Sequence, residues 1–174
     1  MNDQKKSFAY KAWLCFFAGV LLLTGFDQYT KYLAKLHLKG EPAIPLIKNI
    51  LELKYLYPEN RGIAFGLFQG YVPVFVALSL VFFAVILYVL VRIPKTRRYL
   101  PLDATLCLMF SGALGNFIDR TFRGYVIDFI YIPIIDFPVF NLADVYVVVS
   151  GFLLVLLVGF RYQEEELEGI LWKK

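Results

Sequence analysis

Four long apolar segments constrain this chain more than any other feature, because a soluble domain of this size cannot bury so many of them. Residues 71–91 and 145–160 contain no Asp, Glu, Lys, Arg or His. Residues 12–26 and 100–118 are similar, except for Asp103 near the start of the latter. Each segment has roughly 15 to 21 residues, and about 20 helical residues cross the ~30 Å hydrocarbon core of a bilayer. The pattern predicts four transmembrane helices.

The composition and the connecting segments complete this prediction. Hydrophobic residues make up 59% of the 174 residues, and the mean hydropathy is +0.62. Residues 38–70 are too polar and proline-broken to be embedded, and residues 51–55 alternate with the period of a strand. Residues 120–141 are interpreted as a surface loop. We therefore expect an all-α integral membrane protein, one domain over residues 1–174, with a small extracytoplasmic β-element.

The basic residues predict the orientation, because short cytoplasmic segments near membrane spans are enriched in Lys and Arg. They gather before the first span and between the second and third spans, at Lys5, Lys6, Lys11, Arg92, Lys95, Arg97 and Arg98. This distribution predicts that both termini are cytoplasmic. The net charge of +4 suits contact with anionic lipid and requires no nucleic-acid partner. The first span lacks a small-x-small cleavage site, so it is expected to remain as an uncleaved anchor.

With this topology, the aspartates near the outer ends of the spans converge on one membrane face. They are Asp27 and Asp119 at the ends of outward-running spans, Asp144 at the start of the last span, and Asp128 and Asp136 in the outer loop. Ionisable groups at membrane depth are costly, so they are candidates for a functional site.

Helical spacing groups these aspartates with other small and polar residues. Gly112, Gly115, Asn116 and Asp119 share one face, as do Thr24, Asp27 and Lys31, and as do Asn141 and Asp144.

Each group also has a purely structural interpretation. Asp27 and Lys31 form an i,i+4 pair, and Asp119 could be neutralised by the adjacent Arg120. Asn141 could simply cap the last helix.

The histidine and cysteine side chains that other hydrolases use are scarce in this chain, which favours chemistry by carboxylates. The single histidine, His37, follows the first span, while Cys15 and Cys107 are expected to be apolar packing residues. Ser-His or Cys-His hydrolysis and a histidine zinc site are therefore poorly supported. Two neighbouring aspartates can share one proton and hydrolyse a peptide through activated water. These residues alone do not decide which aspartates form the pair.

Five sequence blocks in a fixed order carry a resemblance to a known family. They are DQYTK at residues 27–31, NRGIAFG at 60–66, GALGNFIDR at 112–120, VIDF at 126–129 and FNLAD at 140–144. In these blocks the chain resembles the lipoprotein signal peptidases, also called signal peptidase II.

The resemblance implies an aspartic endopeptidase of the bacterial cytoplasmic membrane with Asp128 and Asp144 as its catalytic pair. The substrate would be a diacylglyceryl-modified prolipoprotein, cut before its lipidated cysteine. The expected enzyme is a monomer in membrane lipid, without cofactor or metal. The residues implied to support substrate and dyad are Asp27, Lys31, Asn60, Gly62, Asn116, Asp119, Arg120 and Asn141.

Two departures from the family pattern concern substrate fit. Ile63 replaces one of two alanines, and Val145 and Tyr146 replace small hydroxyl residues after Asp144.

Two alternative functions remain open at this point. A transporter or ion pathway would need polar residues through the full bilayer depth, whereas the inner halves of these spans are mostly apolar. A non-catalytic scaffold would tolerate Asn at both positions of the dyad.

Overall fold

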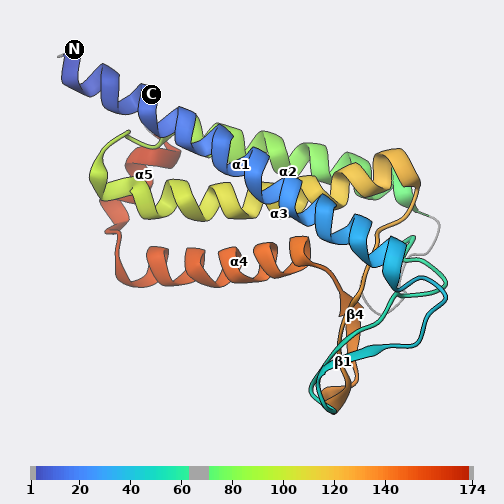
Figure 1. The fold of residues 1–174 in the computed structure, drawn as a ribbon. Coiled ribbons are helices and arrows are strands. Elements are labelled where there is room, and N and C mark those ends of the chain that lie inside the picture. The colour runs from blue at the N-terminus through green and yellow to red at the C-terminus, as the bar shows by residue number, and fades with distance from the viewer. Residues whose placement is uncertain (1–2, 63–70, 173–174) are drawn as a thin grey trace.

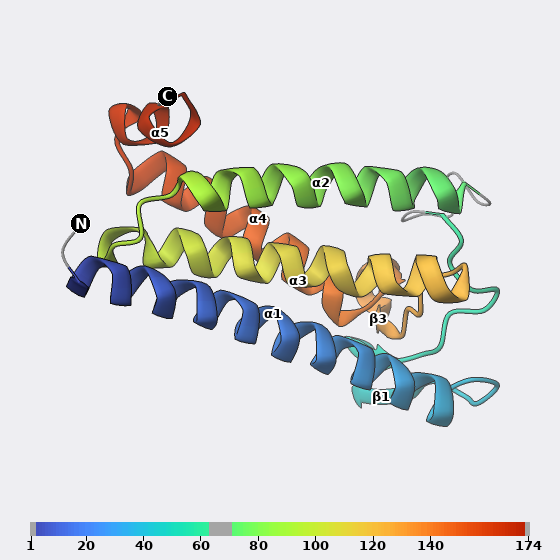
Figure 2. The same ribbon diagram turned by 90° about the horizontal axis from the view of Figure 1, so that it is seen from above.

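Four long helices form the body of the protein, and the computed structural model describes them within residues 3–62 and 71–172. They are α1 (Asp3–His37), α2 (Val72–Arg92), α3 (Leu100–Arg123) and α4 (Leu142–Phe160) (Figure 1). All four are long and apolar enough to cross a membrane, which confirms the four predicted spans. Helix α3 lies between α1 and α2 and also packs on α4 (Figure 2).

Small residues explain why α3 can pack so closely on two neighbours. A Cβ atom added to Gly112 would lie 2.5 Å from the carbonyl oxygen of Ala143 in α4. A Cβ atom added to Gly115 would collide with the carboxylate of Asp27 in α1. Glycine therefore permits the close helix approach that the sequence predicted for this face.

The other half of the bundle has an apolar core. Its buried members include Phe16, Ile86, Leu90, Leu106 and Met109, from α1, α2 and α3. The rings of Phe83 and Phe110 contact each other with centroids 4.7 Å apart. Most of the buried charged and amide side chains, by contrast, lie at the other end of the bundle.

A four-stranded antiparallel sheet projects from the end of the bundle where α4 begins (Figure 1). Its strands follow the order β1 (Ile44–Ile47), β2 (Leu51–Leu53), β3 (Ile130–Ile132) and β4 (Phe137–Phe140). The predicted strand at residues 51–55 is therefore confirmed over its first three residues.

The prediction of a surface loop over residues 120–141 was wrong. Helix α3 continues to Arg123 and ends at Gly124 with φ 74°, and β3 and β4 follow. The prolines argued against a strand in this segment. Strand β4 is an edge strand, however, where the lack of an N–H at Pro138 does not disrupt pairing. Strand β3 forms because it pairs with β2 from the segment between α1 and α2, which local patterns cannot reveal.

A short helix, α5 (Glu164–Leu171), closes the end of the bundle opposite the sheet (Figure 1). Arg98 donates to both carboxylate oxygens of Glu166, at 2.9 and 2.8 Å. The rings of Tyr99 and Tyr162 stack beside this pair. Both termini lie at this end of the bundle.

Candidate active site

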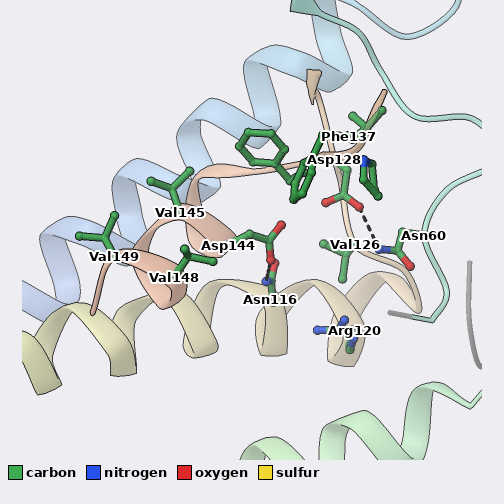
Figure 3. Close-up of a pocket in the computed structure, with 13 residues that line it drawn as sticks. Asn60, Asn116, Arg120, Val126, Asp128, Phe137, Asp144, Val145, Val148 and Val149 are labelled. Carbon is green, nitrogen blue, oxygen red and sulfur yellow. Dashed lines mark hydrogen bonds between the residues drawn. The ribbon is translucent and has the colours of Figure 1, made fainter. Parts of the chain in front are cut away.

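Asp128 and Asp144 line one cavity of about 450 Å³ beside the first turn of α4 (Figure 3). The cavity has a polar end and an extensive apolar wall. Its lining residues are Asn60, Asn116, Arg120, Val126, Asp128, Phe137, Pro138, Val139, Phe140, Asp144, Val145, Val148 and Val149. Helix α3, strand β4 and helix α4 therefore build one pocket from distant parts of the chain.

The start of α4 holds Asp144 in place. Asn141 is the N-cap, and its Oδ1 accepts a hydrogen bond from the backbone N of Asp144 at 3.1 Å. Asp144 Oδ2 in turn accepts from the backbone N of Asn141 at 3.0 Å. This reciprocal capping box confirms that Asn141 caps the helix, as its position predicted. The helix N-terminus also favours a negative charge at Asp144.

Asp128 lies in the segment between α3 and β3 and is only 3% exposed. Its Oδ2 accepts from Asn60 Nδ2 at 2.9 Å, and its Oδ1 accepts from Asn141 Nδ2 at 2.6 Å. Burial and, after it, the negative charge of Asp144 raise the pKa of Asp128 to about 6, although both amides favour its ionised form. Asp128 therefore keeps its proton to a higher pH than an ordinary aspartate does.

Asn116 and Asn141 connect the two carboxylates. Asn116 Nδ2 donates to Asp144 Oδ1 at 2.7 Å, while Asn141 Nδ2 donates to Asn116 Oδ1 at 3.1 Å as well as to Asp128. The Oδ1 atom of Asn116 also accepts from Lys31 Nζ at 3.0 Å. Because Lys31 and Asn141 both donate to its oxygen, Asn116 must direct its Nδ2 toward Asp144.

A buried charge cluster lies directly behind the amides. Lys31 Nζ is 2.9 Å from Asp27 Oδ2 and 3.0 Å from Asp119 Oδ2, and all three side chains are 0% exposed. Asp27 Oδ1 accepts from the backbone N of Ala143 at 2.9 Å, and Asp119 Oδ2 accepts from that of Ile127 at 3.2 Å. These backbone groups directly precede Asp144 and Asp128, so the cluster fixes both aspartates from behind.

The interpretation of Asp119 as a partner of the adjacent Arg120 was wrong. Asp119 pairs with Lys31 and, one helical turn along α3, with Arg123. Neighbouring residues on a helix point in different directions, whereas residues four apart share a face. The predicted pair of Asp27 and Lys31 is confirmed.

Arg120 faces the cavity instead. Its Nη2 donates to the carbonyl oxygen of Gly62 at 3.1 Å, and its guanidinium lies over the ring of Phe75. Its buried Nε has no hydrogen-bond partner among the described residues. The backbone of Asn60 forms an isolated β-bridge with Val126. Asn60 Oδ1 accepts a hydrogen bond from the backbone N of Gly62. These contacts attach the segment before residue 63 to the site.

Sequence reasoning missed Gln28 and Arg123. Gln28 Nε2 donates to Asp119 Oδ1 at 3.2 Å and to the carbonyl oxygen of Gly115 at 3.1 Å. Arg123 donates to Gln28 Oε1 at 2.9 Å and also reaches Asp119. The i,i+4 spacing of Asp119 and Arg123 was a readable signal.

Several candidate residues lie outside the site. Asp136 is exposed and accepts from the hydroxyl of Tyr131 at 2.6 Å, and His37 is exposed at the end of α1. Val145 lines the cavity, whereas Tyr146 is buried against α3 near Gly112. Ile63 lies outside the described residues. Within those residues, no group of three or more His, Cys, Asp or Glu is placed to hold a metal ion.

Comparison with known proteins identifies a family model and relatives that match most of the chain. The family model described as "Signal peptidase (SPase) II" matches residues 19–160. A lipoprotein signal peptidase of Caldanaerobacter subterraneus subsp. tengcongensis is 40% identical over 136 residues, which cover 78% of this chain and 89% of that protein. A lipoprotein signal peptidase of Halothermothrix orenii is 38% identical over 147 residues, which cover 84% and 94%.

Two solved structures share the fold. Both are described as a bacterial membrane enzyme, and both superpose with a TM-score of 0.71. They are 26% and 28% identical to this chain and cover 86% and 84% of it, which corresponds to 92% and 94% of their own chains.

Proposed function

Because the chain belongs to the signal peptidase II family, we propose that Asp128 and Asp144 form the catalytic dyad with which it removes signal peptides from prolipoproteins. As a family member the protein is a multi-pass bacterial membrane peptidase. The observation that carries the aspartic mechanism is the shared cavity of the two carboxylates, each held by two hydrogen-bond donors.

The two carboxylates have different surroundings, which supports a division of roles. Asp144 lies in the first turn of α4 and acts as the base that takes a proton from water. Asp128 has its pKa raised to about 6 and carries the shared proton. It donates this proton to the oxygen of the scissile carbonyl while the water oxygen attacks the carbonyl carbon.

The resulting tetrahedral intermediate then collapses. Asp144 returns its proton to the nitrogen of the leaving amine, and Asp128 recovers a proton from one hydroxyl of the intermediate. The dyad thus ends the cycle with one proton, as it began. Arg120 lines the same cavity, and its guanidinium serves to position a substrate carbonyl.

The apolar wall of the cavity supports a lipid-modified substrate, and we propose that this substrate is cut before its lipidated cysteine. Val145, Val148 and Val149 of α4 continue the cavity along the membrane-spanning part of the helix. Strand β4 contributes further apolar side chains to the lining. A mostly apolar pocket with a few directed polar groups suits an apolar ligand with one reacting bond.

The described residues give no support to an ion pathway. Between Asp103 and Asn116 in α3, Thr105 and Ser111 donate their hydroxyls to carbonyls of their own helix, at 2.8 and 2.7 Å. The apolar core occupies this depth of the bundle.

Cleavage of a lipid-modified precursor by purified variants tests the dyad. Asp128→Asn and Asp144→Asn should each lower turnover by at least about 10²- to 10⁴-fold with the substrate still bound, and the double variant should be scarcely worse. Asp136→Asn is the matched control, because this aspartate is exposed and should keep full activity. Retained turnover in Asp128→Asn, together with its loss in a folded Asp119→Asn, would reassign the dyad to Asp119 and Asp144.

A further inference from the structure

Another cavity, of about 780 Å³, lies between α1, α3 and α4 toward the end of the bundle that holds the termini. Its lining residues are Phe8, Lys11, Ala12, Cys15, Phe16, Leu23, Leu100, Pro101, Asp103, Ala104, Thr105, Cys107, Leu108, Leu153 and Leu157. The proposed dyad and its amides belong to the other cavity. Helix α4 accordingly turns Leu153 and Leu157 to this space and Val145, Val148 and Val149 to the dyad.

Helices α1 and α4 diverge toward the N-terminus of α1 (Figures 1 and 2). The residues of α1 and α4 that line the cavity lie in this part of the bundle. Its lining on α1 runs from Phe8 to Leu23, about 22 Å at 1.5 Å per helical residue, and the part from Lys11 to Leu23 is about 18 Å long. One leaflet of a bilayer contributes about half of a ~30 Å hydrocarbon core. The part of the cavity beyond Lys11 is therefore close to the depth of a single leaflet.

The interior of this cavity is apolar. Thr105 is among its few polar members, and its hydroxyl donates to the carbonyl oxygen of Pro101. Water has little to bind there, and an empty space would cost the lining its dispersion contacts. A flexible hydrocarbon chain suits a cavity with these walls.

The charges near one end of the cavity do not balance. Asp103 accepts from Lys95 Nζ at 2.7 Å, and Lys95 also lies over the ring of Trp13, 4.7 Å from its centroid. Lys11 lines the same cavity and has no acidic partner within ion-pair distance among the described residues. Asp103 is thus paired with Lys95, and the charge of Lys11 at the same cavity stays without an acidic partner among the described residues.

We propose that this cavity binds one acyl chain of an anionic phospholipid, with the phosphate beside Lys11. The lipid belongs to the leaflet on the side of the N-terminus. It joins α1 to α4 where the two helices diverge. A negatively charged headgroup balances the positive charge of Lys11.

Quenching of Trp13 by brominated lipids tests this proposal. Trp13 adjoins Ala12, which lines the cavity, and Trp172→Phe leaves it as the single tryptophan of the full-length protein. Mixed bilayers of brominated phosphatidylglycerol and phosphatidylcholine then give the relative binding constant of the two lipids. We expect a preference of about fivefold for phosphatidylglycerol, as one lysine near a headgroup provides.

Two variants separate the charge from the cavity. Lys11→Gln removes the charge, and Ala104→Phe fills the space without touching Lys11, so both should abolish the preference. Lys6→Gln and Ala18→Phe are matched controls on α1 outside the lining, and both should retain it. Equal binding of the two lipids by the starting protein would overturn the proposal. So would a preference that survives Ala104→Phe, because Lys11 would then attract headgroups without the cavity.

Discussion

The side-chain amide of Asn141 donates a 2.6 Å hydrogen bond to Oδ1 of Asp128, although Asn141 belongs to the start of α4 and Asp128 to the segment after α3. The backbone N of Asn141 donates to Asp144 at the same time. One residue thus begins the last membrane helix and joins the two proposed catalytic carboxylates. The spacing of the dyad is therefore coupled to the first turn of α4.

Substitution of Asn141 should separate these two roles. Serine caps a helix about as well as asparagine, whereas alanine costs about 1 kcal/mol. Asn141→Ser should keep much of the thermal stability that Asn141→Ala loses, yet both should lose the hydrogen bond to Asp128. A hydrogen bond to a charged group contributes about 1.5 to 3 kcal/mol, so kcat should fall about 10- to 100-fold in both variants. Full activity in Asn141→Ser would show that capping alone matters.

The raised pKa of Asp128 predicts a conflict between activity and stability. A carboxyl group whose pKa rises on folding, here from 3.8 to about 6, stabilises the fold below pH 3.8 and loses that contribution as the pH rises through about 6. Asp128→Asn removes the buried charge, so it should stabilise the protein by up to about 3 kcal/mol above pH 7. The gain should vanish near pH 4. Thermal unfolding of both proteins in detergent across this range measures the difference, and a gain independent of pH would contradict the assignment.

The same aspartate should govern how activity depends on pH. If Asp128 carries the proton of the dyad, kcat/KM should fall as the pH rises above about 6, which forms the alkaline limb of a bell-shaped profile. The hydrogen bond from Asn60 favours the ionised form and so lowers the pKa of Asp128. Asn60→Ala should therefore move the alkaline limb to higher pH. A shift to lower pH, or no shift in an active variant, would contradict this role for Asp128.

Accessibility of cysteines should establish which way the protein crosses the membrane. In a background without Cys15 and Cys107, cysteine at Tyr57 or Phe122 should react with an impermeant thiol reagent in intact cells. Both positions are highly exposed at the end of the bundle that carries the sheet. Cysteine at Arg97, at the other end, should react only after the cells are opened. The reverse pattern would place the dyad on the cytoplasmic side.

The sequence predicted the parts of this fold that depend on local composition. The four spans, the shared face of Gly112 and Asn116, and the pair of Asp27 with Lys31 all follow from hydropathy and helical spacing. Strand β3 did not, because it pairs with β2 from a distant part of the chain, and β4, which pairs only with β3, has its strand signal interrupted by Pro138. The resemblance to a family, rather than any local rule, singled out Asp128 among the outer aspartates. Only the structure explains its setting, since Asn60 and Asn141 approach it from distant elements.

Removal of Lys31 should expose how strongly the proposed dyad depends on the buried charges behind it. Lys31→Met leaves Asp27 and Asp119 buried without their common partner, which should cost about 3 to 5 kcal/mol of stability. It also removes a donor that orients Asn116 toward Asp144, so any folded fraction should have a reduced kcat. Lys39→Met is the matched control, because its ion pair with Glu59 lies at the surface and should contribute no measurable stability. Adding Asp27→Asn to Lys31→Met should restore part of the stability by removing one unpaired charge, but not the activity. Equal stability of Lys31→Met and Lys39→Met would show that the cluster does not hold the site together.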